Sequence, residues 1–412
     1  MSSEERRVFG ARVADLRKQR GMTQGELATA IGRTASWLSQ VERGVQPVNR
    51  LDVLRLLADG LGVPLQVLQP DAPAPAEAET SSPPDVNDLD RARLVLSGHS
   101  ALDVLLEPRQ DFSPDSLAGL RASVDRIWEL THGGQFAELS AAITSSVPLL
   151  EQAVRTAPAE YLPELHDLLA RIYQALSAAF VRQNEADAAW VAADRAVREA
   201  ELSGSALGVF VGIYRLCHAF VRLNRLDQAE HAAATAVSAL LRHVECNEPT
   251  PQHLSVLGSL HLMLALVHAR SGERTSARQQ IGAARRVAGL LGEDRNDFNL
   301  EFGPTNVEIQ AVSTAVELGD AGEALDIADG LRMDGLSAER QARLLMDLGR
   351  AHAQRRQYAA SLDCLLRAEG LAPEVVHTHV VARAVVRDLV LVAGRSASDE
   401  LRALAGRTDS LA

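Results

Sequence analysis

Residues 21–44, GMTQGELATAIGRTASWLSQVERG, determine the fold of the N-terminal part of this chain. Thr23 and Glu26 have the spacing of a capping box, in which side chains bond the free backbone amides of a helix start. Gly32 then allows a turn, and Thr34 is placed to cap a second short helix. The pattern predicts two short helices joined by a turn, which is the geometry of a helix-turn-helix.

The two expected helices each have an apolar face and a polar face. Leu27, Ala28 and Ile31 lie on one face of the first helix, and Leu38 and Val41 on one face of the second. The opposite face of the second helix carries only small or polar residues, namely Ala35, Ser36, Ser39 and Gln40. Such a face suits a helix that lies close to another surface, as in the major groove of DNA.

The runs TQGELATAIG and TASWLSQVERG resemble the Xre/lambda-repressor type of helix-turn-helix, and the resemblance covers about the first seventy residues. It implies an all-α domain of five helices over residues 1–68. Carried over by position, it implies contacts with double-stranded DNA. Gln24 would hold the DNA backbone, the four residues of the polar face would meet base edges, and Arg33, Arg43, Asn49 and Arg50 would lie near phosphates.

Side-chain chemistry agrees with that assignment. A glutamine amide can pair with adenine, an alanine can meet a thymine methyl group, and arginine can hold phosphate. Thr34 and Trp37 belong to the same expected interface, although Trp37 could equally pack on the domain. The alternative is that Ser39 and Gln40 are solvated polar positions.

The composition predicts packed helices and a soluble protein. The 412 residues are 46% hydrophobic but only 4% aromatic, and the basic residues are 41 arginines and one lysine, which fits a high-GC bacterial source. Net charge is −12, yet residues 1–68 hold ten basic and seven acidic residues, so DNA contact should be confined to this module and be sensitive to salt.

The three cysteines, Cys217, Cys246 and Cys364, are far apart, which favours a reducing cytoplasm over a zinc site or disulfides. No apolar run has the length of a signal peptide or of a ~18-residue membrane span. We expect a cytoplasmic protein without a membrane partner, a metal or a cofactor.

Residues 69–90 interrupt the helical pattern with five prolines, six acidic residues and no basic residue. Such a segment cannot bury a core, so we expect an extended, semi-rigid linker. It separates the 1–68 domain from a second domain, 91–412.

A pattern of two helices and a short turn recurs in the second domain. FVRQNEADAA at residue 180 returns as FVRLNRLDQA at residue 220. The second helix of each unit carries a small residue at an equivalent position: Ala189, Ala229, Ala277, Ala324 and Ser361. These segments resemble tetratricopeptide repeats over about residues 160–375, with a degenerate unit near Trp128, and imply an α-solenoid. Spacings of 40, 48, 47 and 37 depart from the regular 34, and a generic helical bundle is the alternative.

The first helix of each repeat should present its side chains on the inner face of the solenoid. Counting from the small residues gives the candidate effector-binding set Arg171, Gln174, Tyr214, His218, Asn306, Arg343 and Arg350. Amide, guanidinium and phenol groups can hold a peptide backbone or a carboxylate, although each residue alone is more often only solvated. Asn306 stands out because FGPTN breaks one helix and starts another.

The sequence favours a regulator over an enzyme. HExxH, GxSxG and GxxxxGK[ST] do not occur, and His261 and His268 lack a partner with ligand spacing, so packed or solvated histidine is the better interpretation. The whole chain resembles bacterial regulators of the Xre–tetratricopeptide type, an architecture similar to peptide-pheromone regulators with related forms in actinobacteria. This implies a homodimer on an inverted-repeat operator, controlled by an effector peptide, small molecule or partner protein. The alternative is a protein-interaction scaffold in which DNA binding is secondary.

Overall fold

The computed structural model describes residues 3–31, 35–45, 57–58, 60–61, 63, 67, 87–98, 112–331 and 336–410. The chain divides into two units, Met1–Pro84 and Asp85–Ala412. The described residues form helices, and the sole β-type pairing among them is an isolated bridge between Arg295 and Phe302. The all-α prediction is therefore confirmed.

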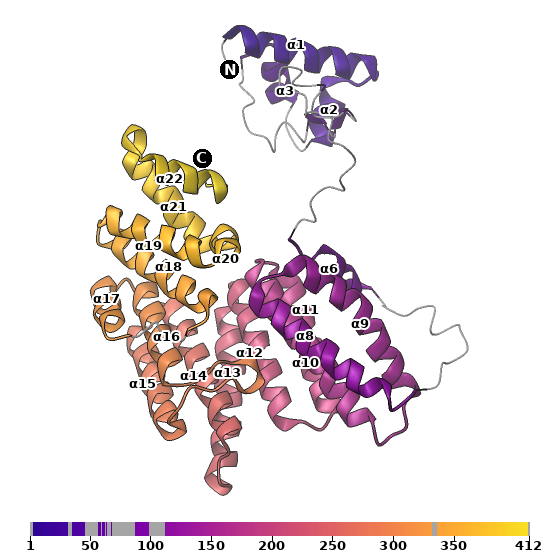
Figure 1. Ribbon diagram of the computed structural model, residues 1–412. Coiled ribbons are helices and arrows are strands. Elements are labelled where there is room, and N and C mark those ends of the chain that lie inside the picture. The colour runs from indigo at the N-terminus through magenta and orange to yellow at the C-terminus, as the bar shows by residue number, and fades with distance from the viewer. Residues whose placement is uncertain are drawn as a thin grey trace. The chain divides into compact units, whose positions relative to one another are not determined.

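The N-terminal unit contains α1 (Ser3–Gln19), α2 (Gln24–Ala30) and α3 (Ala35–Glu42), which pack together as Figure 1 shows. The predicted capping box is present. The Thr23 hydroxyl accepts a bond from the Glu26 amide at 3.2 Å, and the Glu26 carboxylate accepts one from the Thr23 amide at 2.7 Å. The two helices thus lie where residues 21–44 predict them, and the predicted turn at residues 32–34 lies outside the described part.

The core of this unit contains the expected apolar residues of α2 and α3, with Leu27, Leu38 and Val41 fully buried. From α1 it takes Val13 and also Phe9. Val8, by contrast, is 51% exposed. The neighbouring position turns the larger Phe9 inward. The fourth and fifth predicted helices lie mostly outside the described residues, but Leu57, Ala58 and Leu61 belong to this core.

The second unit begins before Asp90, where the sequence had placed the end of the linker. The side chain of Asn87 donates to the Gly134 carbonyl at 3.0 Å and accepts from the amides of Phe136 and Ala137 at 2.6 and 3.1 Å. Leu89 is fully buried. These contacts tie residues 87–90 to the repeats, so the C-terminal end of the linker was placed too late. Residues 69–86 lie outside the described part.

After α6 (Asp90–Ser97), the second unit is a series of helical hairpins. Successive pairs are α8 (Ser116–Gly133) with α9 (Phe136–Thr156), α10 (Leu162–Arg182) with α11 (Ala186–Leu202), α12 (Ala206–Arg222) with α13 (Leu226–Cys246), α14 (Pro251–Arg270) with α15 (Arg274–Leu291), α16 (Pro304–Glu317) with α17 (Ala321–Asp329), and α18 (Ala338–Gln354) with α19 (Tyr358–Leu371). The short α20 (Pro373–Thr378) leads into α21 (Val380–Ala393) and α22 (Asp399–Arg407).

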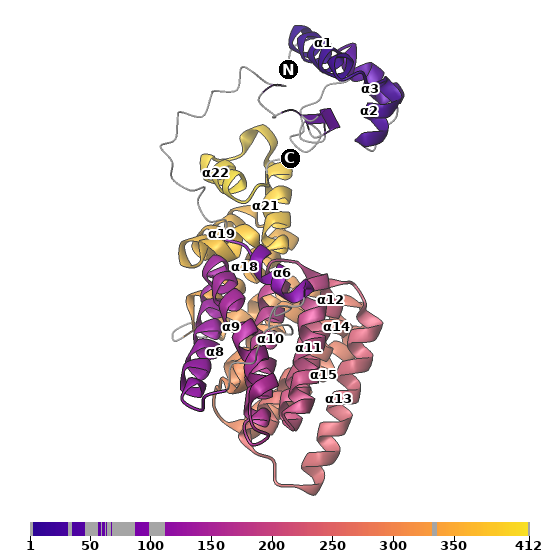
Figure 2. The ribbon, with the colours of Figure 1, turned by 90° about the vertical axis from the view of Figure 1, so that its right-hand side faces the viewer.

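The first helices of neighbouring hairpins pack on one another, α8 on α10, α10 on α12, α12 on α14, α14 on α16 and α16 on α18. Figure 2 shows α8, α10, α12 and α14 following one another in this order. Contact between neighbours in sequence is the mark of a solenoid, whereas a closed bundle would bring distant helices together around one core. The repeat prediction is therefore favoured over the generic bundle.

Small residues allow the two helices of each hairpin to approach closely. The predicted positions Ala189, Ala229, Ala277, Ala324 and Ser361 are all fully buried. Seven residues later, Ala196, Ala236, Ala284 and Ala368 are buried as well, whereas Leu331 is only partly buried. Leu331 follows the end of the short helix α17, which explains why it lies outside the close contact.

Each hairpin turn contains one residue with left-handed backbone. The φ angles are 61° at Asn184, 56° at Asn224, 76° at Gly272, 79° at Gly319 and 59° at Arg356. In every case the following amide bonds back to a carbonyl five residues earlier, for example Glu185 to Phe180 at 2.9 Å. This closes the last helical turn in a Schellman arrangement and reverses the chain.

By length and composition α14 could cross a membrane, since its mean hydropathy is 1.2, and it is the sole such helix in the described part. However, 72% of the apolar window is buried among the repeats. The helix is apolar on all sides because it packs between α13, α15 and the neighbouring first helices α12 and α16. This accounts for its composition without a membrane.

Candidate DNA interface and effector pocket

A buried ion pair fixes the helix-turn-helix. Arg17 of α1 donates through Nε and Nη2 to the two carboxylate oxygens of Glu42 at 2.6 and 3.0 Å, and through Nη1 to the Met22 carbonyl at 2.7 Å. The amide of Gln24 donates to the same carboxylate at 2.7 Å. The Arg17 and Glu42 side chains are only 10% and 7% exposed. One carboxylate thereby joins α1, α2 and α3.

The bonds to Glu42 outweigh the cost of burying its charge. Burial alone would raise the pKa of this carboxyl, but the hydrogen bonds from Arg17 and Gln24 lower it below the usual range. The bond to Glu42 likewise raises the pKa of Arg17. The pair is therefore ionised at neutral pH, and the Glu42 carboxylate connects α3 to α1 through Arg17 and to α2 through Gln24.

The structure gives Gln24 an internal partner that sequence reasoning missed. The resemblance had placed this amide on the DNA backbone, and its nitrogen instead faces Glu42. Glu42 belongs to the ERG run that the sequence had singled out, but helical periodicity does not indicate which distant side chains bond to that glutamate. The assignment of Gln24 to DNA remains a prediction for its free amide oxygen.

The outer face of α3 remains partly exposed. Ser39 and Gln40 are half-buried, opposite the fully buried Leu38 and Val41. Arg43 is exposed, and its Nε donates to the Ser39 carbonyl at 3.2 Å. Ala35, Ser36 and Trp37 lie on α3, but their side chains are outside the described part, as are Arg33, Thr34, Asn49 and Arg50 entirely.

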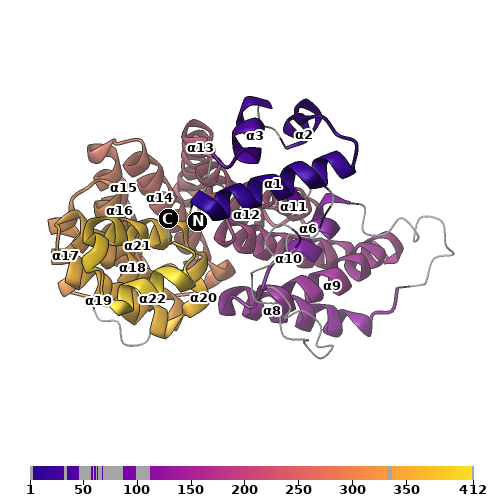
Figure 3. The same ribbon diagram turned by 90° about the horizontal axis from the view of Figure 1, so that it is seen from above.

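The repeat unit contains a cavity of about 310 Å³. It is lined by the first helices α8, α10, α12, α14, α16 and α18, together with residues 299–301 and 374–381. Figure 3 looks down on the array, with α8 and α10 on one side and α16 and α18 on the other. An ion pair between Arg182 of α10 and Glu339 of α18, 2.9 Å apart, connects these distant repeats at the cavity.

Five of the seven predicted effector residues line this cavity: Tyr214, His218, Asn306, Arg343 and Arg350. The other two do not. Arg171 pairs with Asp125 at 2.7 Å, and Gln174 is 3% exposed with its amide 3.4 Å from the Gly208 carbonyl. The cavity meets α10 only from Ser177 onward, so Arg171 and Gln174 are too near the start of that helix to reach it.

Sequence reasoning missed most of the basic residues of the cavity. The lining also contains Arg182, Arg215, Arg222, Arg270, Arg340, His132 and His379. A signal was available for three of them. Arg182, Arg222 and Arg270 each end a first helix, two residues before the left-handed turn residue. The repeat itself therefore places successive guanidinium groups at one rim of the inner surface.

A strained segment between α15 and α16 forms another part of the wall. Phe298, Asn299 and Glu301 have φ angles of 54°, 56° and 51°, a conformation that costs of order 1 kcal/mol or more for non-glycine residues. Phe302 anchors the segment, because its ring lies where a Cβ on Gly258 of α14 would be. α16 then starts at Pro304, as FGPTN predicted, and Asn306 reaches the cavity.

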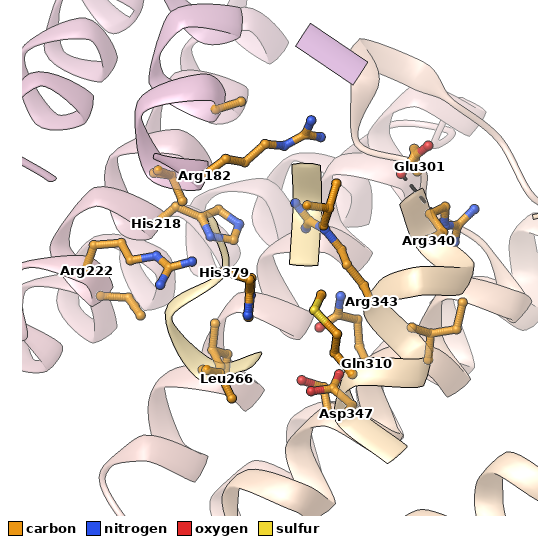
Figure 4. Close-up of a pocket in the computed structure, with 18 of the residues that line it drawn as sticks. Arg182, His218, Arg222, Leu266, Glu301, Gln310, Arg340, Arg343, Asp347 and His379 are labelled. Carbon is orange, nitrogen blue, oxygen red and sulfur yellow. Dashed lines mark ion pairs between the residues drawn. The ribbon is translucent and has the colours of Figure 1, made fainter. Parts of the chain in front are cut away.

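The cavity side chains lie around a common space in Figure 4, with Arg182, His218 and Arg222 on one side, Arg343 on the other and His379 between them. Burial, reinforced by nearby arginines, lowers the pKa of His218 and of His379 to about 3. Burial also lowers the pKa of Arg182 to about 10 and raises the pKa of Asp347 to about 6. At neutral pH the histidines are neutral and the arginines carry the charge.

The expected absence of a histidine metal site concerns His261 and His268. Each is buried and bonds one polar side chain, Gln280 at 2.7 Å and Glu273 at 2.9 Å respectively. Within the described ranges no group of three or more potential ligands gathers around a metal position.

Comparison with known proteins supports the N-terminal assignment. A family model described as a helix-turn-helix domain matches residues 8–70. With the observed α2 and α3, it defines this unit as a helix-turn-helix domain, a class typical of DNA-binding regulators of transcription.

The whole chain is also similar to the crystal structure of Bacillus thuringiensis PlcR in complex with the peptide PapR7 and DNA. The identity is 13%, the similarity covers 88% of this chain and 98% of that chain, and the TM-score is 0.31. A likeness this distant carries no argument about ligand or partner. A search of curated proteins found no match.

Proposed function

We propose that the chain is a sequence-specific, DNA-binding transcriptional regulator of the Xre type whose helical repeats bind an effector that alters DNA binding. The observation that carries the proposal is the α2–α3 motif, held by the Arg17–Glu42–Gln24 network, with Ser39 and Gln40 left partly exposed on α3. A polar outer face on the second helix of such a motif is what base recognition requires. No catalytic role is assigned to the chain.

The regulator acts as a cytoplasmic homodimer on an inverted repeat. Two-fold operators place half-sites about 34–36 Å apart, so a change in the spacing of two N-terminal units is enough to weaken binding. The cavity supports a role for the repeats in that change, because it is bounded by α10 and α18, which are distant in sequence. A ligand bound there would alter the curvature between them.

Selection of bound fragments from random DNA by the full-length protein tests this function. We expect an inverted repeat to be recovered, and Gln40→Ala to relax the base preference at defined positions by about 1–3 kcal/mol. Gln19→Ala is the matched control, because Gln19 is an exposed glutamine of α1 in the same unit. Recovery of no specific sequence would reject the regulator and favour the scaffold alternative.

A further inference from the structure

Buried polar atoms without a hydrogen-bond partner gather at one place in this protein. Among the described residues these atoms are Trp128 Nε1, Ser177 Oγ, Arg215 Nε, Arg340 Nη2, His379 Nδ1 and Arg155 Nη1. All except the Arg155 atom belong to residues that line the cavity, and Arg155 is paired with Glu151. Buried polar groups are normally satisfied, so their concentration in one cavity indicates a ligand that supplies the missing partners.

The chemistry of these atoms specifies what that ligand must offer. An indole nitrogen and guanidinium nitrogens can only donate hydrogen bonds, and the Ser177 hydroxyl and His379 ring can donate as well. No atom in the group is restricted to accepting. The ligand must therefore be rich in acceptors.

Arg215 is buried and is contacted from several sides. It is only 9% exposed, its guanidinium lies 5.4 Å from the ring centres of both Trp128 and Tyr214, and its Nη2 donates to the Asn299 carbonyl at 2.9 Å. No carboxylate pairs with it in the described part of the chain. A buried guanidinium held in this way presents an uncompensated positive charge.

Acidic side chains do not neutralise the cavity. Arg182 and Arg343 share the single carboxylate of Glu339, each at 2.9 Å, and Arg270 and Arg350 share that of Glu317 at 3.6 and 3.1 Å. Arg222, half-buried at the left of Figure 4, has neither a hydrogen bond nor an ion pair with any described residue. Seven arginines line the cavity against four acidic lining residues and Glu339, in a chain whose net charge is −12.

We propose that the effector is a small organic anion whose carboxylate or phosphate binds between Arg222, Arg215 and Arg343. The cavity volume of about 310 Å³ is at the lower end of the ~300–1,000 Å³ typical of small-molecule sites. Trp128, Val221, Leu266 and Met346 provide apolar wall for a carbon skeleton. The identification of the anion as an effector rests on the regulatory function proposed above, whereas its binding does not.

Thermal unfolding of the full-length protein tests the proposal with three anions, phenylacetate, phenyl phosphate and the dipeptide acetyl-Ala-Phe. Phenylacetamide and acetyl-Ala-Phe amide are the neutral counterparts of the two carboxylates, and all compounds are compared at equal ionic strength. We expect at least one anion, and no neutral compound, to raise the melting temperature saturably. The responding anion distinguishes a carboxylate metabolite, a phosphate ester and a peptide C-terminus. Equal responses to charged and neutral compounds, or no saturable response to any anion, overturn the proposal.

Substitutions of Arg222 give a second test, and one of its readouts, the melting temperature of the ligand-free protein, needs no ligand. Because Arg222 lacks a counter-ion among the described residues, Arg222→Met should raise the melting temperature of the ligand-free protein. The same substitution should raise the dissociation constant of the anion at least tenfold. Arg222→Lys should retain a weaker response. Arg285→Met is the control, because Arg285 is paired with Glu308 outside the cavity and its loss should leave anion binding unchanged. A lower melting temperature for ligand-free Arg222→Met would contradict the proposal.

The two proposals fail separately. If an anion binds but the affinity for the selected DNA stays constant, the anion site stands and regulation through it is rejected. If DNA affinity responds only to a neutral compound, regulation stands and the anionic effector is rejected.

Discussion

The two units treat buried arginine in opposite ways. In the helix-turn-helix unit, Arg17 meets Glu42 through two bonds and the Met22 carbonyl through a third, so its charge is matched inside the fold. In the repeat unit, Arg215 and Arg222 have no carboxylate partner among the described residues. A buried charge with a partner connects the helices that carry the two groups. A buried charge without a partner lowers stability, and a bound ligand of opposite charge can offset that cost. The comparison separates residues that hold the fold from residues that serve a site.

The largest effect is expected when the matched pair is broken. Arg17→Met leaves the Glu42 carboxylate buried with Gln24 as its remaining side-chain donor, which should destabilise the N-terminal unit by about 3–5 kcal/mol. Hydrogen exchange of the amides of α2 and α3 in the full-length protein measures this loss. Arg43→Met is the control, because Arg43 is exposed and its side chain, among the described residues, bonds only the Ser39 carbonyl of α3.

The same substitution in the repeat unit, Arg222→Met, should act in the opposite direction. Unchanged protection of α2 and α3 in Arg17→Met would contradict the comparison, because it would show that the buried pair contributes no more to stability than the unpaired arginine.

Acid should weaken the Arg17–Glu42 pair as well. The pKa of Glu42 is lowered in the folded state, so its stabilisation is present above the unfolded pKa and is lost as pH falls through the folded value.

A carboxyl in the cavity should show the reverse pH dependence. Burial raises the pKa of Asp347 to about 6, against the opposing effects of a Ser313 bond and of Arg350 and Arg343, while Glu317 acts with burial. A raised carboxyl pKa means that folding favours the protonated form, so this group's contribution is lost as pH rises through about 6.

Asp347→Asn should therefore raise the free energy of unfolding at pH 8 by about 3 kcal/mol, at about 1.4 kcal/mol per unit of pKa, and by far less at pH 4. Urea unfolding followed by circular dichroism at the two pH values measures the difference. Asp363→Asn is the control, because Asp363 is exposed on α19. An equal gain at both pH values would show that Asp347 acts through packing and not through its charge.

The sequence predicted the framework of both units well because the framework depends on local patterns. Thr23 and Glu26 are three residues apart, and the small residues such as Ala189 and Ala229 recur at the same point of each hairpin. The partner of Glu42 and the grouping of Arg182 with Arg343 depend on contacts between residues far apart in sequence. Arg171 and Gln174 were assigned by helix face alone, and only the curvature of the array determines how far along α10 the cavity extends.

The smallest effect concerns glycines in turns. The two units differ in whether glycine is required by the backbone conformation alone or also by close packing. Gly44, at φ 72°, ends α3, and a Cβ there would lie 2.9 Å from the backbone of Arg7, so both conformation and space require glycine. Gly319 in the repeats has φ 79° but no atom within 4 Å of such a Cβ. Gly319→Ala should therefore cost only the left-handed strain, about 1 kcal/mol, and Arg356→Gly at the equivalent turn should recover about as much. Gly44→Ala should cost more than Gly319→Ala, because α1 must also move away. Urea midpoints of the three variants test this order, and a cost for Gly319→Ala as large as that for Gly44→Ala would show that conformation alone determines both turns.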